Sequence, residues 1–184
     1  MQVQRLMINK NRTQSNRTRA GHSMAGFPRR YYRTWGSFWA DFKFLMSNRD
    51  QIRQAMQSDL ITPAFRERLM LAVTEVNQCT YCRKFHVGQA RQAGITTEEI
   101  TQFLKGSIPG DIPEDQKLAV CYAQHWAESD GQSDPELKAK VIEAYGESGY
   151  KAISIVMRMI WMGNLLGNTG DYYLYRISFG RLGN

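Results

Sequence analysis

Apolar residues recur with the period of an α-helix along most of this chain, and that pattern limits the fold more than any other feature. A clear example follows Pro63, where four apolar residues occupy the i, i+3, i+4 and i+7 positions of one helix face: Leu69, Ala72, Val73 and Val76. No segment bounded by turns shows the sustained alternation of apolar and polar residues that marks a half-buried strand. The sequence therefore predicts an all-α fold with roughly six to eight helices.

Capping residues, prolines and glycines predict where these helices begin and end. Aromatic residues at helical spacing predict a first helix from Trp35, and residues 50–56 form a second candidate. Thr62 and the proline after it open the next helix, which weakens at Asn77 and Gln78. The remaining predicted helices cover residues 79–93, 97–106, 114–129, 135–145 and 149–166.

The last of these predicted helices is the most apolar, so it is the one to consider as a membrane-spanning segment. Gly167, Asn168 and Gly170 are expected to end it. Its apolar part is interrupted by Arg158 and is shorter than the roughly 20 residues needed to cross a bilayer. No apolar stretch follows the early charges as it would in a secretory signal. We therefore expect no membrane association.

Positive charge is concentrated at the start of the chain. The formal net charge is +7, but residues 1–40 contain no acidic residue and eight of the 24 basic ones: Arg5, Lys10, Arg12, Arg17, Arg19, Arg29, Arg30 and Arg33. The rest of the chain carries all 17 acidic residues and is close to neutral. We predict a basic, flexible arm over residues 1–34 and a helical domain over 35–184. A neutral body argues against nucleic-acid binding by the domain and leaves polyanion binding by the arm open.

The number and spacing of the cysteines indicate the cellular compartment of the protein and the chemistry of its thiols. The three cysteines are an odd number, and Cys79 and Cys82 stand only three positions apart, unlike the wider, even-numbered frameworks of secreted domains. A reducing cytoplasm is therefore expected. If a helix begins at Cys79, both sulfurs lie in its first turn, where free N–H groups and the helix dipole favour thiolate. His86 follows Cys82 at i+4, so its imidazole lies over the same face and can exchange protons with a thiol.

A C-x-x-C pair has other uses, which have to be weighed against redox chemistry. Structural zinc sites also contain it, but they normally have four ligands, and no second C-x-x-C or H-x-x-x-H follows in this chain. Metal binding through the two cysteines, His86 and a carboxylate stays possible, as does an inert pair. The pattern favours a redox pair with no bound metal or cofactor.

Residues 67–86 resemble the alkylhydroperoxidase D-like (AhpD-like) branch of the carboxymuconolactone decarboxylase family. The motif of that branch is a glutamate, eleven residues, C-x-x-C, three residues and a histidine. Glu67, Cys79, Cys82 and His86 match each position and each gap. The similarity extends over about residues 60–106, and residues 1–34 lie outside it.

The resemblance implies a thiol-dependent peroxidase that reduces alkyl hydroperoxides. Cys82 would attack the peroxide and become a sulfenic acid, and Cys79 would resolve it to a disulfide. His86 would deprotonate Cys82, Glu67 would relay the proton of Cys79, and Tyr81 would add a hydroxyl to the relay. A dithiol or protein reductant would restore the thiols, and a homo-oligomer is expected.

Several alternatives stay open at this stage. Glu75 rivals Glu67, because it would lie at i−4 from Cys79 in an unbroken helix. Cys121 and His125 form another i, i+4 pair, which we interpret as a buried thiol and a histidine near a helix end. A non-redox decarboxylase or isomerase-like relative is one functional alternative, although decarboxylase members generally lack the paired cysteines. The other is a redox-sensing or disulfide-exchange module with a polyanion-binding arm.

Overall fold

The computed structural model describes residues 27–57, 59 and 61–183. This part of the chain contains seven helices and no strand, which confirms the all-α prediction. The helices are α2 (Trp35–Ser47), α3 (Arg49–Gln57), α4 (Pro63–Asn77), α5 (Thr80–Gln92), α6 (Thr97–Leu104), α7 (Glu114–Glu128) and α8 (Pro135–Ile177). Residues 1–26 of the predicted flexible arm lie outside the described residues.

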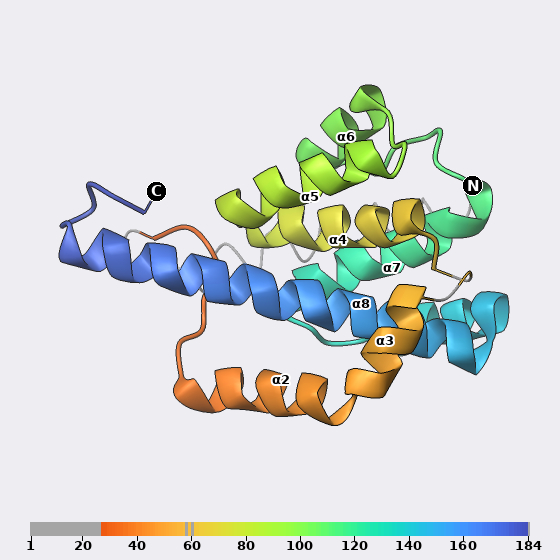
Figure 1. Cartoon of the computed structure of the whole chain (residues 1–184), viewed down its shortest axis with the longest axis horizontal. Helices are drawn as coiled ribbons and strands as arrows, with labels where there is room; N and C mark the ends of the chain where they lie inside the picture. Colours follow the sequence, from red (N-terminus) through yellow and green to blue (C-terminus); the bar gives the residue numbers. More distant parts are fainter. Residues whose placement is uncertain (1–26, 58, 60, 184) are drawn as a thin grey trace.

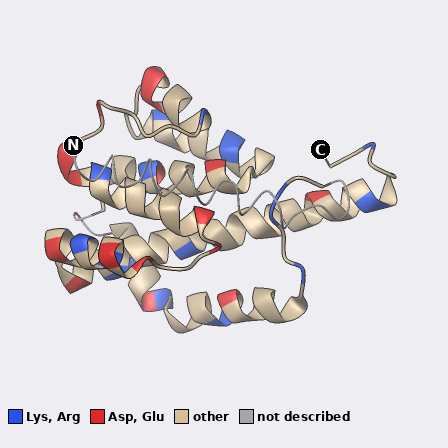
Figure 2. Ribbon diagram, turned by 180° about the vertical axis from the view of Figure 1, so that it is seen from behind, with Lys and Arg blue, Asp and Glu red and all other residues tan. Residues whose placement is uncertain are grey.

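The long helix α8 runs the length of the molecule, with α4, α5, α6 and α7 on one side and α2 and α3 on the other (Figure 1). Helix α4 is the central element, since it contacts α5, α6, α7 and α8. Basic and acidic residues are interspersed along the helices (Figure 2). Within the described residues, none of the helices combines the length and the hydropathy that a bilayer span requires.

Most side chains of α4 are buried in the interior of the molecule. Phe65, Leu69, Leu71 and Val73 are all almost completely inaccessible to solvent. Even Arg68 is buried, and its guanidinium forms two hydrogen bonds with the carboxylate of a residue on α6. A buried ion pair of this bidentate form offsets the cost of removing both charges from water. Helix α4 is therefore held on all sides, which fixes the positions of the side chains that it presents to α5.

One predicted boundary is wrong, because α8 does not end at Gly167, Asn168 and Gly170 but continues to Ile177. Tertiary contacts outweigh the low helix propensity of the glycines here. The Asn168 side chain donates hydrogen bonds to the backbone carbonyls of Asn77 and Arg30. The break that was expected between residues 145 and 149 does occur, at Gly146, where φ is 69° inside the same long helix.

Residues 27–34, which we call the strap, lie against the helices although they fall within the predicted arm. The Tyr32 amide donates to the Thr169 hydroxyl on α8 at 3.0 Å. The Arg30 guanidinium donates to the last carbonyls of α7, on Ala127 and Glu128. The strap thus crosses α8 before α2 begins (Figure 1). Within the described residues, 27–34 therefore pack on the helical part of the chain.

Candidate active site

The junction between α4 and α5 places both cysteines at the start of a helix. Gln78 adopts a left-handed conformation, with φ of 56°, and this ends α4. Cys79 then serves as the N-cap of α5, and its Sγ accepts a hydrogen bond from the Cys82 amide at 3.3 Å. The left-handed Gln78 therefore ends α4 and produces the turn that presents the C-x-x-C pair.

Cys79 and Cys82 are joined by a disulfide, with their Cα atoms 5.3 Å apart. Both side chains are sheltered, since Cys79 is 1% exposed and Cys82 is 7% exposed. They lie at the N-terminal end of α5, where unpaired amides and the helix dipole stabilise negative charge on sulfur. Cys82 is the more accessible of the two, and on reduction it would be the thiol that a small oxidant reaches first.

His86 and Glu67 form a buried pair beside this turn. Nδ1 of His86 on α5 lies 2.8 Å from Oε2 of Glu67 on α4, and the residues are 9% and 6% exposed. A carboxylate acceptor holds the proton on Nδ1, which leaves Nε2 as the basic nitrogen. The structure thus brings together four residues selected from the sequence, namely Cys79, Cys82, His86 and Glu67.

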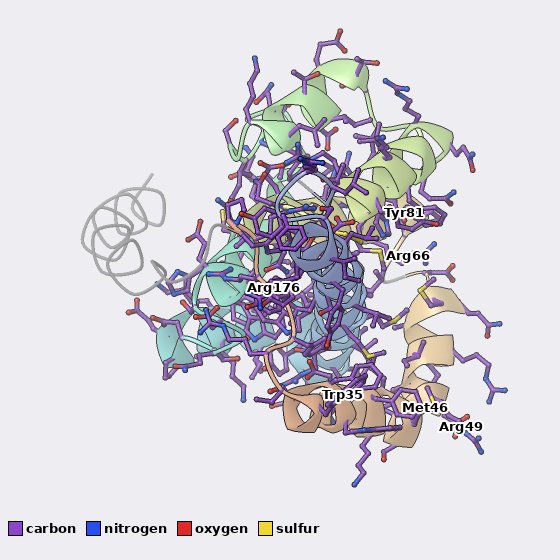
Figure 3. The ribbon with its side chains drawn as sticks, turned by 90° about the vertical axis from the view of Figure 1, so that its left-hand side faces the viewer. Trp35, Met46, Arg49, Arg66, Tyr81 and Arg176 are labelled. Atoms are coloured by element: carbon purple, nitrogen blue, oxygen red, sulfur yellow. A yellow bond between two sulfur atoms is a disulfide. The ribbon has the colours of Figure 1, made fainter. Side chains whose placement is uncertain are left out.

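Two other candidate residues face elsewhere. Tyr81 is 74% exposed and lies at the surface of the molecule in Figure 3. Glu75 forms an ion pair with Arg83 at 2.7 Å, and its carboxylate also accepts a hydrogen bond from Gln78. Of the two glutamates, Glu67 is therefore the one bonded to the histidine of the motif, and Glu75 bridges the α4–α5 turn.

The second cysteine–histidine pair has a different environment. Burial raises the pKa of the Cys121 thiol to about 11, which keeps it protonated and unreactive near neutral pH. His125 lies 4.0 Å from a carboxylate oxygen of Asp134. Over the part of the chain that the structure describes, no group of three or more His, Cys, Asp and Glu side chains is arranged to hold a metal ion.

Some residues at the site were not identified from the sequence. A Cβ atom built on Gly167 of α8 would lie 3.0 Å from the Cys79 sulfur and 3.7 Å from the Cys82 sulfur, so α8 covers the disulfide closely. Arg29 of the strap donates a hydrogen bond to Thr80, the first residue of α5. The Gly163-x-x-x-Gly167 spacing indicates that α8 can pack closely on a neighbour, but the groups that Gly167 and Arg29 contact follow only from the tertiary fold.

The comparisons with known proteins agree with the motif. The model described as the carboxymuconolactone decarboxylase family matches residues 43–109, which contain both cysteines, the histidine and Glu67. No curated protein and no solved structure matches the chain. Residues 43–109 of the chain are therefore similar to the carboxymuconolactone decarboxylase family.

Proposed function

We propose that the protein is a thiol-dependent peroxidase that reduces alkyl hydroperoxides. The observation that carries the proposal is the Cys79–Cys82 disulfide at the N-terminus of α5, beside the buried His86–Glu67 pair. The dithiol form of such a reversible pair supplies the two electrons that peroxide reduction needs, and the pair then closes to the disulfide. The match of Glu67, Cys79, Cys82 and His86 to the motif of the AhpD-like branch supports the same function.

The first step consumes the hydroperoxide. His86 takes the thiol proton of Cys82, and the resulting thiolate attacks the O–O bond. A sulfur–oxygen bond forms, the O–O bond breaks, and the alkoxide takes a proton from the imidazolium to leave as an alcohol. Cys82 is then a sulfenic acid, which is sulfur oxidised by two electrons.

The second step closes the disulfide and returns the enzyme to its oxidised form. The Cys79 sulfur attacks the Cys82 sulfur and breaks its S–O bond. Glu67 and His86 relay the Cys79 proton to the departing hydroxyl, which leaves as water. A dithiol or a protein reductant then exchanges with the disulfide and restores both thiols. A reducing compartment such as the cytoplasm would supply that reductant.

Single cysteine variants test the function and the assignment of roles. With cumene hydroperoxide and excess dithiothreitol, Cys82→Ser should consume peroxide only at the uncatalysed rate, because the attacking thiolate is gone. Cys79→Ser should instead accumulate a sulfenic acid that dimedone traps on Cys82. Cys121→Ser is the matched control and should keep full turnover.

Two results would contradict the proposal. Full turnover in Cys82→Ser would exclude the mechanism altogether. A dimedone adduct that forms on Cys79 in Cys82→Ser, with peroxide consumed at the same time, would reverse the roles of the two cysteines.

A further inference from the structure

Arg29 of the strap makes a partly buried ionic contact at the start of the disulfide helix. Its side chain is 7% exposed, and its Nη1 lies 2.6 Å from Oδ2 of Asp171 on α8. The same nitrogen donates to the Thr80 hydroxyl at 3.2 Å, while Nη2 donates to the Gly183 carbonyl. We call Arg29 and Asp171 the strap ion pair. Arg29 precedes the family-matched segment and Asp171 follows it.

The strap ion pair lies close to the two sulfurs. Thr80 follows Cys79 directly and belongs to the same helical turn as Cys82. Asp171 stands one turn beyond Gly167 on the same face of α8, and Gly167 is the residue that covers the sulfurs. Two opposite charges are therefore fixed next to the turn in which thiolate forms.

Other charged groups around α5 are also paired. Arg83 bonds to Glu75 at 2.7 Å, and His86 bonds to Glu67 at 2.8 Å, while Lys84 is exposed to solvent. Two arginines near the cysteine pair, Arg29 and Arg83, thus each have a carboxylate partner. Removing a single partner leaves an uncompensated charge close to the sulfurs, where burial limits the screening by water.

The charge next to the sulfurs matters because the oxidised and reduced forms of the pair differ in charge. Two glutathione molecules reduce the disulfide by supplying two electrons, and they leave as glutathione disulfide while the protein gains two thiols. The more acidic of these thiols then releases its proton and becomes a thiolate, whereas the disulfide is neutral. A nearby cation favours the reduced form, and a nearby anion favours the disulfide.

We propose that Arg29 and Asp171 are positioning residues whose balanced charges set the redox equilibrium of the Cys79–Cys82 pair. This inference rests on the proposed thiol function. It adds that two residues outside the family-matched segment affect the redox equilibrium of the cysteines. The positive charge of Arg29 offsets the negative charge of Asp171. The cysteine pair is therefore more oxidising than it would be next to the Asp171 carboxylate alone.

Opposite single variants separate this electrostatic role from a purely structural one. Arg29→Gln leaves the Asp171 carboxylate uncompensated, and we expect the equilibrium constant with glutathione to shift about fivefold toward the disulfide. Asp171→Asn leaves the guanidinium uncompensated, and we expect a shift of about fivefold toward the dithiol. The double variant should lie close to the wild type. The full chain is equilibrated in glutathione buffers, and its thiols are counted by alkylation and mass spectrometry.

Control variants make each outcome decisive. Arg53→Gln breaks an exposed ion pair with Asp50 on α3 and should leave the equilibrium unchanged. Arg29→Lys keeps the charge and should stay near the wild type. Shifts of the same sign in Arg29→Gln and Asp171→Asn, or no shift in either, would overturn the inference. If Arg29→Gln does not fold, the direction of the shift in Asp171→Asn decides.

The two proposals can fail separately. A wild-type disulfide that glutathione and dithiothreitol never reduce would contradict the proposed function itself. A wild-type pair that exchanges normally, with variants that do not move in opposite directions, would contradict only the role of the strap ion pair.

Discussion

His86 forms a buried hydrogen bond with Glu67, and that bond determines which imidazole nitrogen can act as a base. Glu67 accepts at 2.8 Å from Nδ1, so Nε2 is the nitrogen left to exchange a proton with a thiol. Histidine is suited to this exchange because one imidazole nitrogen can donate a proton while the other accepts one. The proposed role of His86 as a base depends on this orientation.

We predict that His86→Gln slows peroxide reduction by about 100-fold, the lower end of what a general base contributes. Glutamine fills a similar volume but cannot take the proton of Cys82. The measurement is the rate of cumene hydroperoxide consumption together with the pH dependence of Cys82 alkylation. His125→Gln is the matched control, since His125 lies on α7 near Asp134. An unchanged rate and pH profile in His86→Gln would remove the imidazole from the mechanism.

The environment of Cys121 predicts how its alkylation depends on pH. Burial raises the pKa of the Cys121 thiol to about 11, so this thiol holds its proton through the range in which an ordinary cysteine ionises. Only the thiolate reacts with iodoacetamide, so labelling of Cys121 should stay slow until the pH approaches about 11. Peptide mass spectrometry of the reduced, folded protein over a pH series measures this. A labelling midpoint near the ordinary cysteine value of about 8.5 would show that the thiol is open to solvent.

The packing of helix α8 on the disulfide predicts opposite effects on stability for alanine substitutions at two of its glycines. Alanine at Gly167 would push its Cβ against the Cys79 sulfur, so Gly167→Ala should lower the unfolding free energy by about 1–3 kcal/mol. Gly163, one turn earlier, has no atom within 4 Å of its Cβ position. Gly163→Ala should therefore raise the unfolding free energy by up to about 1 kcal/mol, through helix propensity alone.

Urea unfolding of both glycine variants, oxidised and reduced, measures these effects. The difference between Gly167→Ala and Gly163→Ala should be largest for the oxidised protein, in which the disulfide holds the two sulfurs in place. Equal stabilisation by both substitutions would mean that α8 does not pack closely on the cysteine pair.

Local sequence signals predicted most helices, and the exceptions have a physical cause. Thr62 caps α4 and Cys79 caps α5, because capping interactions act within a few residues. The end of α8 was misplaced, since Asn168 bonds to segments that are distant in the sequence. Helical spacing likewise predicted that Cys82 and His86 share one face of α5. The Arg29–Asp171 contact, in contrast, spans 142 positions and follows only from the tertiary fold.

At the scale of the whole molecule, the site is assembled from four segments. Helix α4 supplies Glu67, α5 supplies the cysteines and His86, α8 covers the disulfide, and the strap adds a charge beside it. Removing the strap should therefore change the redox equilibrium as well as the stability, unlike the removal of an unattached tail.

We predict that the protein forms homo-oligomers through the last turns of α8. Four large apolar side chains there are about half exposed or more and recur at helical spacing: Leu166, Tyr173, Leu174 and Ile177. An exposed stripe of this kind is a common mark of a protein interface. Size-exclusion chromatography with light scattering should give a multiple of the chain mass, and Leu174→Glu should give monomers. A wild-type monomer at micromolar concentration would contradict this expectation.

The most direct test of the central claim is a count of free thiols before and after peroxide. When the samples are unfolded before alkylation, reduced protein should present three alkylatable cysteines, and one equivalent of cumene hydroperoxide should leave only Cys121 free. Peptide mass spectrometry should then identify a disulfide between Cys79 and Cys82, formed faster than in His86→Gln. If all three thiols stay alkylatable, or if the peroxide consumes Cys121 instead, the cysteine pair is not the peroxide-reducing centre.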